Sequence, residues 1–252
     1  MDRLSVEDLK RTVEKILDIF KCAVCKEKVK GEVTKCKNHH WLCGECKTLL
    51  KKCPTCSEPF STAAISKTVN EVIAALPTKC KHNCQLYVMP NGDDHEKYCG
   101  YRQTDCKLCE WQGCAKDIAE HAEQQHSNNL VSFTEDMQNM ITITKAETLD
   151  QKMEIYYPCI ALGEFFWTRI LIDPESQKYF SQLIPIRINK QFQKLFVKIV
   201  FRSGNTKLVV RLKLDFEKDF DADGDSFSLD LKILEKFVEQ GFLNSLFKVK
   251  SL

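Results

Sequence analysis

The sequence predicts a multidomain α+β chain in which small cysteine-rich modules precede a mostly antiparallel β-sandwich or barrel. Thirteen of the 14 cysteines fall between Cys22 and Cys114, and the only other one is Cys159. After residue 130 the pattern changes to apolar residues that alternate with polar ones, which is typical of half-buried strands. A length of 252 residues is enough for about two or three small modules.

Two helices are predicted ahead of the strands. In residues 5–20, Ser5 and Asp8 have the spacing of a capping box. The apolar residues that follow recur at helical intervals, namely Leu9, Val13, Ile16, Leu17 and Phe20. Residues 64–76 show a second helical pattern, and Pro77 is expected to end that helix.

The C-terminal half is predicted to fold as antiparallel strands. Residues 207–216 alternate between apolar and polar side chains, and residues 195–201 show the same rhythm. The intervening Ser203-Gly204-Asn205 has the composition of a hairpin turn. Further strands are expected near 153–162, 164–173, 179–189 and 243–250, with one helix near 230–240 closed by Gly241.

The first cysteine block, residues 22–56, has the spacing C-x2-C-x10-C-x3-H-x2-C-x2-C-x6-C-x2-C. Its eight candidate ligands are Cys22, Cys25, Cys36, His40, Cys43, Cys46, Cys53 and Cys56, with His39 as an alternative to His40. Thiolates and imidazoles in this number make two tetrahedral zinc sites, and so short a segment needs metal to fold. Disulfides are disfavoured because no export signal is visible and histidines stand at ligand spacing.

The second cysteine block, residues 80–126, supplies two more sets of four. The first set is Cys80, Cys84, His95 and Cys99, and the second is Cys106, Cys109, His121 and His126. Four Zn2+ ions are therefore expected, all structural, because closed four-ligand sites leave no position for water or substrate. Cys114 is an alternative that could replace Cys106 or Cys109, while Cys159 and His82 are left over.

The charge of the chain disfavours nucleic acid and membrane as partners. The net charge is only +2, and the presumed helix of the last finger carries Asp117, Glu120 and Glu123 with few basic residues. No secretory signal is visible at the start, and the apolar stretch around 160–167 is far shorter than the roughly 20 residues of a membrane helix. We therefore expect a soluble cytoplasmic protein, with a nuclear fraction left open.

The ligand string, the Cys-Pro-Thr-Cys that closes the first block and the Cys-Glu-Trp-Gln-Gly of the last finger resemble the seven-in-absentia (SIAH/Sina) family of RING-type E3 ubiquitin-protein ligases. The resemblance implies a RING domain, two SIAH-type zinc fingers and a TRAF-like β-sandwich that binds substrates and dimerises. The corresponding boundaries are an N-terminal helix at 1–20, the RING at 21–60, a helical linker at 61–78, the tandem fingers at 79–126 and the TRAF-like domain at 127–252.

The resemblance also implies how the first block is used. A cross-braced RING pairs Cys22 and Cys25 with Cys43 and Cys46, and pairs Cys36 and His40 with Cys53 and Cys56; this pattern favours His40 over His39. The surface for the ubiquitin-conjugating enzyme would include Val24, Leu50 and Pro54. The chain would bring the charged enzyme to bound substrates, promoting their ubiquitination and proteasomal degradation, without a catalytic residue of its own.

Two departures from the family pattern keep an alternative function open. Ser57 stands where family members commonly carry an arginine that helps hold the ubiquitin thioester, and the Cys80–Cys84 spacing is shorter than usual. A RING and TRAF-like adaptor or scaffold that discharges ubiquitin poorly is therefore the alternative. A zinc-finger protein that binds nucleic acid is a weaker one.

An acidic segment at 219–230 resembles a calcium-binding EF-hand loop. Asp219, Asp221, Asp223, Gly224 and Asp230 fit the required spacing. However, the preceding segment has a strand pattern, Ser226 stands where an apolar residue is usual, and Asp230 replaces the usual glutamate. An acidic surface loop is the favoured interpretation.

Overall fold

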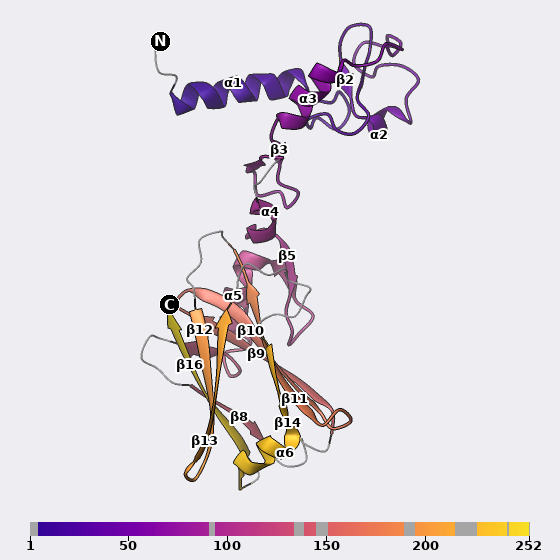
Figure 1. Cartoon of the computed structure of the whole chain (residues 1–252). Coiled ribbons are helices and arrows are strands. Elements are labelled where there is room, and N and C mark those ends of the chain that lie inside the picture. The colour runs from indigo at the N-terminus through magenta and orange to yellow at the C-terminus, as the bar shows by residue number, and fades with distance from the viewer. Residues whose placement is uncertain are drawn as a thin grey trace. The chain divides into compact units, whose positions relative to one another are not determined.

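The helices and strands of the chain divide into two units, Met1–Asp93 and Asp94–Leu252 (Figure 1). This computed structural model describes residues 5–90, 94–133, 139–144, 151–188, 195–214, 226–240 and 242–251. The predicted order of domains, with small cysteine-rich modules followed by an antiparallel β-sandwich, is confirmed. Within the described residues, no helix combines the length and the apolar character needed to cross a membrane.

Helix α1 (Val6–Ile19) begins where the sequence predicts. The Ser5 hydroxyl accepts a hydrogen bond from Asp8 N, and the Asp8 carboxylate in turn accepts from Ser5 N, so the capping box is complete. The apolar side of this helix is only partly covered, because Leu9 is 50% exposed and Val13 and Ile16 are half-buried. Its C-terminal turn is held by Leu17, which is buried, and by Phe20, which packs against the core of the first cysteine block.

The first cysteine block folds around a two-stranded sheet, β1 (Thr34–Lys35) with β2 (Trp41–Leu42), followed by the short helix α2 (Gly44–Lys47). Its small core contains Val29 and Leu42, both fully buried. Because this core has so few apolar side chains, burial alone cannot stabilise it.

Helix α3 (Lys67–Ala75) confirms the second predicted helix and packs against the first cysteine block. Ser66 caps its first turn, and Ile73 enters the small core beside Val29. Lys28 closes the other end, where its Nζ donates to the carbonyl oxygens of Ile73 at 3.1 Å and Leu76 at 2.5 Å. A cation is favourable at a helix C-terminus because the carbonyl groups there point outward unpaired. The unit ends with the short pair β3 (Thr78–Lys79) and β4 (Tyr87–Val88).

The second unit begins with a small zinc-finger-like region. It contains α4 (His95–Tyr98), a hairpin of β5 (Gln103–Asp105) and β6 (Gln112–Cys114), the 3-10 turn η1 (Ala115–Asp117) and α5 (Ile118–Gln125). Ile118 and Ala122 of α5 are buried in one cluster with Phe165 and Trp167 of the sandwich. The finger is therefore packed on the sandwich.

The sandwich has two sheets that face each other across one core. The first has the order β14-β11-β10-β9-β7 and the second β13-β12-β16-β15, with β8 also paired to β16. The strand bounds are β7 (Val131–Phe133), β8 (Asn139–Thr144), β9 (Met153–Ala161), β10 (Glu164–Asp173), β11 (Lys178–Ile186), β12 (Leu195–Ser203), β13 (Thr206–Leu214), β14 (Ser226–Asp230), β15 (Val238–Glu239) and β16 (Phe242–Ser251). All pairs are antiparallel except β7 with β9.

The predicted β12–β13 hairpin is confirmed, and its two faces differ as the alternation requires. Ser203 pairs with Thr206 around the turn, in which Gly204 has φ +51°. Leu212 points into the core, while Val209 on the opposite face is 38% exposed. The alternation of the sequence thus identifies which face of this sheet is buried.

The predicted helix near 230–240 is wrong in extent. The structure has a single turn of α-helix, α6 (Leu231–Leu234), then the 3-10 turn η3 (Glu235–Phe237) and strand β15. Pairing of Val238 with Leu243 outweighs the helical periodicity, because the antiparallel pairing satisfies backbone groups that the helix would have used. Gly241 lies outside the described residues, and so does most of the EF-hand-like segment, including Asp219, Asp221, Asp223 and Gly224. Asp230 accepts a hydrogen bond from Lys232 N and caps α6.

Candidate metal centres

Sixteen cysteine and histidine side chains gather into four groups of four. In each group the four candidate ligand atoms lie within 4.8 Å of one another. The groups are Cys22, Cys25, Cys43 and Cys46; Cys36, His40, Cys53 and Cys56; Cys80, Cys84, His95 and Cys99; and Cys106, Cys109, His121 and His126. The first two interleave along the chain, which is the cross-braced arrangement.

The distances within these groups fit zinc. A tetrahedral ion with Zn–S bonds of about 2.3 Å and Zn–N bonds of about 2.0 Å places two sulfurs about 3.8 Å apart, and sulfur and nitrogen about 3.5 Å apart. Sγ atoms of Cys25 and Cys43 are 3.9 Å apart, and His40 Nδ1 lies 3.5 Å from Cys36 Sγ. A disulfide would require about 2.05 Å. The cysteines are all unbridged, and zinc is the cofactor that this donor set supports.

Tight backbone turns present the cysteine pairs. Lys26 follows the first pair with φ +61°, and its N–H donates to Cys22 O at 3.1 Å. Ser57 follows the last pair of the block with φ +59°, and its N–H donates to Cys53 O at 2.8 Å. A left-handed backbone costs roughly 1–2 kcal/mol for a residue other than glycine. Two such residues at equivalent positions indicate that ligand geometry imposes the conformation.

The turns also direct backbone N–H groups at the sulfur atoms. Val24 N lies 3.4 Å from Cys22 Sγ, and Cys43 N lies 3.5 Å from the same sulfur. Burial raises the pKa of Cys22, but the N–H groups of Cys43, Cys25 and Val24 outweigh it and bring that pKa down to about 7. The pKa of Cys43 rises to about 12, because it is buried and its neighbours are already negative. Four thiolates here need a bound cation to be ionised together.

The short Cys80–Cys84 spacing does not keep these two residues from the third group. Both thiols join it, and two left-handed residues shape the turn: Asn83, between the cysteines, at φ +57°, and Gln85, directly after them, at φ +67°. Cys80 N still donates to a carbonyl beyond the pair, that of Leu86, at 2.9 Å. Gln85 holds the same position after its pair as Lys26 and Ser57 hold after theirs, so Asn83 is the additional left-handed residue of this longer loop.

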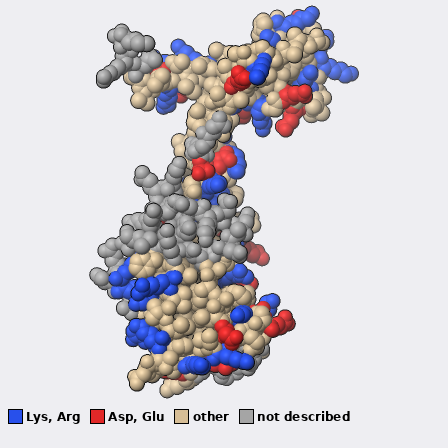
Figure 2. All heavy atoms as spheres, viewed as in Figure 1, with Lys and Arg blue, Asp and Glu red and all other residues tan. Residues whose placement is uncertain are grey.

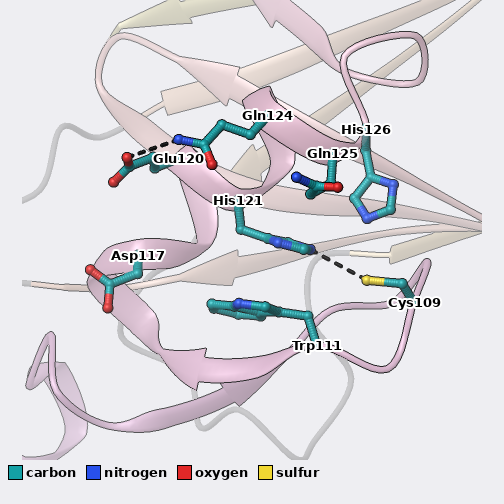
Figure 3. A pocket seen from close by; sticks show the side chains of 8 residues that line it. All are labelled: Cys109, Trp111, Asp117, Glu120, His121, Gln124, Gln125 and His126. Carbon is teal, nitrogen blue, oxygen red and sulfur yellow. Dashed lines mark hydrogen bonds between the residues drawn. The ribbon is translucent and has the colours of Figure 1, made fainter.

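The last group is built around stacked rings (Figure 3). His121 Nε2 lies 3.4 Å from Cys109 Sγ, and Trp111 stacks on the same imidazole with centroids 4.4 Å apart and planes 12° apart. A side chain at Gly113 would overlap the Trp111 ring. Burial, and then the neighbouring His126, lower the pKa of His121, which keeps it in the neutral form that binds zinc. Trp111 therefore orients a ligand, and Gly113 leaves room for Trp111.

The remaining cysteines and histidines lie outside all four groups. Cys114 is half-buried in β6 and does not join the last group, and His39, with φ +63°, is not in the second. Cys159 is fully buried with its Sγ 3.3 Å from Thr168 Oγ1, and burial raises its pKa to about 12. Such a thiol is a poor nucleophile.

Known proteins resemble parts of this chain. A family model described as the RING finger of E3 ubiquitin-protein ligase sina/sinah matches residues 22–56. E3 ubiquitin-protein ligase siah2 of Xenopus laevis is 26% identical over 46% of this chain and 39% of its own length, and siah-1 of Caenorhabditis briggsae is 31% identical over 45% and 28%. Human SIAH2 is 26% identical over 45% of this chain and 37% of its own length.

This chain is similar to seven-in-absentia ligases, and the family model matches its RING segment. It spans less than half the length of these curated relatives. The matched segment 22–56 contains the first two groups, so the seven-in-absentia RING and the cross-braced zinc clusters are the same structure.

The residues expected on the enzyme-binding surface of this seven-in-absentia RING differ in exposure. Val24 is 43% exposed and Pro54 is exposed, each inside a cysteine turn. Leu50 is half-buried and packs against the core of the RING, whereas its neighbour Leu49 is 92% exposed. No pattern in the sequence separates these two leucines, because the short α2 ends just before them and no helical period continues through the turn.

Proposed function

We propose that this chain is a RING-type E3 ubiquitin-protein ligase. The observation that carries the proposal is the cross-braced pair of clusters in the segment that matches the sina/sinah RING model. The zinc ions, held by closed sets of four ligands, supply folding free energy and take no direct part in ubiquitin transfer. The chain accelerates transfer by proximity, because it holds the charged conjugating enzyme and the substrate together.

The RING offers a small rigid surface to the conjugating enzyme. Val24 and Pro54 project from two cysteine turns whose backbones are fixed by the ligands on both sides. A rigid apolar surface loses little conformational entropy on binding, which favours a specific contact despite its small area. Leu50 supports this surface from the core side, and the fully solvated Leu49 adds an exposed apolar side chain next to it in the chain.

The partners of the C-terminal half belong to the same proposal. The sandwich binds protein substrates and pairs with a second copy of the chain, and the ubiquitinated substrates go to the proteasome. The relatives are named as ubiquitin-protein ligases, and a two-sheet sandwich with its own core can form a binding module independent of the RING.

Reconstituted ubiquitination tests the ligase proposal. Wild-type chain, ubiquitin, activating enzyme and a panel of conjugating enzymes should give autoubiquitination, and Cys43→Ser should abolish it because Cys43 belongs to the first group. Cys114→Ser is the matched control and should keep full activity, because Cys114 joins no group. Elemental analysis should find four zinc ions per wild-type chain.

An adaptor that binds partners without discharging ubiquitin is the second candidate, and Ser57 is the observation that favours it. This exposed residue occupies the left-handed position after the last RING cysteine. Arginine has the same backbone cost there, so Ser57→Arg changes the side chain without changing the turn. Absence of transfer by a zinc-loaded wild type with every conjugating enzyme contradicts the ligase proposal, and recovery in Ser57→Arg would identify the cause.

A further inference from the structure

The outer face of the second sheet carries cations in register across three strands. Lys198 of β12 stands directly opposite Arg211 of β13 on one side and opposite Lys248 of β16 on the other. Four residues further along β12, on the same face, Arg202 stands opposite Lys207. Figure 2 shows Lys and Arg side chains gathered over these strands.

These cations are not neutralised within the described part of the chain. No ion pair joins Lys198, Arg211 or Lys248 to an acidic side chain there. Partial burial, and then the charges of Lys207, Arg211, Lys248 and Lys250, lower the pKa of Lys198. Like charges directly opposite each other on a sheet are destabilising. Local arrangements that cost stability are expected at functional sites, so this basic row indicates a binding surface.

An apolar row separates the two basic rows. Val200 of β12 stands between Val209 of β13 and Leu246 of β16. Val209 is 38% exposed and Leu246 is half-buried, so part of this row is open to solvent. Each basic row lies two residues away along the strands, which is about 6.8 Å.

Other occupants fit this face poorly. A second copy placed on it through a two-fold axis would bring Lys198, Arg211 and Lys248 against the same cations. Nucleic acid is disfavoured because the central row has aliphatic side chains and no ring on which a base could stack, and the sequence pI of about 7.9 is below that of typical nucleic-acid-binding domains. An anionic membrane surface would attract the cations, but the apolar row between them has only Val and Leu side chains and none of the Trp or Tyr rings that are enriched at membrane interfaces.

We infer that the outer face of β13, β12 and β16 docks an acidic protein segment in extended conformation. In this segment an apolar residue has acidic residues two positions before and two positions after it. Side chains two apart on an extended peptide lie on one side about 6.8 Å from each other, which matches the row spacing of the sheet. The apolar side chain covers Val209, and the two acidic ones meet Arg211 with Lys198, and Lys207 with Arg202.

This inference deepens the proposed function, because it gives the chemical class of substrate segment that the sandwich recognises. The test measures binding directly and needs no ubiquitin transfer. A chain that binds the segment but transfers no ubiquitin would contradict the ligase proposal alone. A chain that ubiquitinates itself but does not bind the segment would contradict the docking inference alone.

Fluorescence anisotropy with the zinc-loaded full chain is the experiment. The probe is a short labelled peptide with the core Glu-Ser-Leu-Ser-Glu. One comparison peptide replaces Leu with Ser, and another moves both Glu residues next to each other. We expect the first peptide to bind best and its affinity to fall as salt is raised, since exposed charges are screened over about 8 Å at physiological ionic strength.

Variants of the face complete the test. Lys198→Glu with Arg211→Glu should weaken binding of the first peptide by about tenfold or more, and Val209→Ser should remove its advantage over the peptide that lacks Leu. Lys232→Glu with Lys236→Glu is the matched control, because these exposed lysines lie in α6 and η3. A thermal unfolding curve confirms that each variant is folded.

Three results would overturn the inference. The first is wild-type chain that does not bind the Glu-Ser-Leu-Ser-Glu peptide, and the second is equal binding by the Lys198 and Arg211 double variant. The third is tighter binding of a single-stranded oligonucleotide, or of an anionic vesicle, than of the peptide, provided that this binding is lost in the same double variant. Each of these leaves the RING assignment untouched.

Discussion

At the residue scale, the last zinc group shows why a short motif has the residues that it has. Trp111 stacks on the ligand His121, and the glycine two positions later leaves the space that the indole ring fills. The spacing of cysteines and histidines identifies which side chains gather, since it reflects how far ligands can be apart in a small loop. The spacing does not predict the stacking of Trp111, because a tryptophan next to a cysteine pair gives the same sequence whether its ring is packed or exposed.

Gly113→Ala should weaken zinc binding by the last group. The new methyl group would overlap the Trp111 ring, and overpacking of this kind costs about 1–3 kcal/mol. A displaced indole no longer holds His121 in its ligand orientation. Competition with a chromophoric chelator should show one zinc ion per chain released more readily than in the wild type.

Gln112→Ala is the matched control, because Gln112 is exposed in the same strand. Equal zinc release by Gly113→Ala and the wild type would show that the Trp111 stack does not position His121.

At the element scale, the structure departs from the sequence pattern where tertiary contacts decide. Residues 230–240 have helical periodicity, but pairing of Val238 with Leu243 ends the helix after one turn and a 3-10 extension. Strand β10 is buried on both faces over Phe165–Thr168, since the finger covers one face and the opposite sheet covers the other. In contrast, β13 has one solvated face, and its alternation predicts its orientation correctly. Alternation of apolar and polar residues predicts orientation only for a strand that is buried on one face. A strand that is covered on both faces has apolar residues at successive positions and shows no alternation.

Lys28→Ala should loosen helix α3 from the RING. The substitution removes both hydrogen bonds to the carbonyl oxygens of Ile73 and Leu76, and the charge at that helix terminus. We expect the free energy of unfolding of the RING unit to fall by about 1–2 kcal/mol. Amide hydrogen exchange in the variant should be faster than in the wild type in α3, with a smaller increase in β1 and β2.

Lys30→Ala serves as the control, because Lys30 is exposed and the hydrogen bond from its backbone N–H to Cys43 Sγ is kept. Unchanged exchange in α3 of the Lys28 variant would mean that Ile73 alone anchors the helix.

At the scale of the whole molecule, zinc is expected to matter differently for the two units. The RING core has few buried apolar side chains, whereas the sandwich has a large core of its own drawn from both sheets. The last zinc group belongs to the second unit and shares a cluster with Trp167. Metal therefore decides whether the RING folds at all, and adjusts the stability of a sandwich that folds by burial.

A strong chelator should unfold the RING and only destabilise the sandwich. Exchange protection should be lost at Leu42 and Val29 of the RING core and kept in β9, β10 and β11. The thermal midpoint of the sandwich should fall by about 2–4 °C, as expected for a loss near 1 kcal/mol in a unit of this size.

The same chelator saturated with zinc beforehand controls for non-specific effects. A RING core that stays protected without metal would contradict the structural role assigned to the first two groups.

The contact between the finger and β10 has a consequence for dividing the protein into fragments. A fragment that begins at residue 127 keeps both sheets but lacks the α5 residues that cover Phe165 and Trp167. The two aromatic rings would then be exposed to solvent, and exposed aromatic surface promotes aggregation. Aggregation of such a fragment would result from the choice of its N-terminal boundary, because the last finger covers one face of the sandwich.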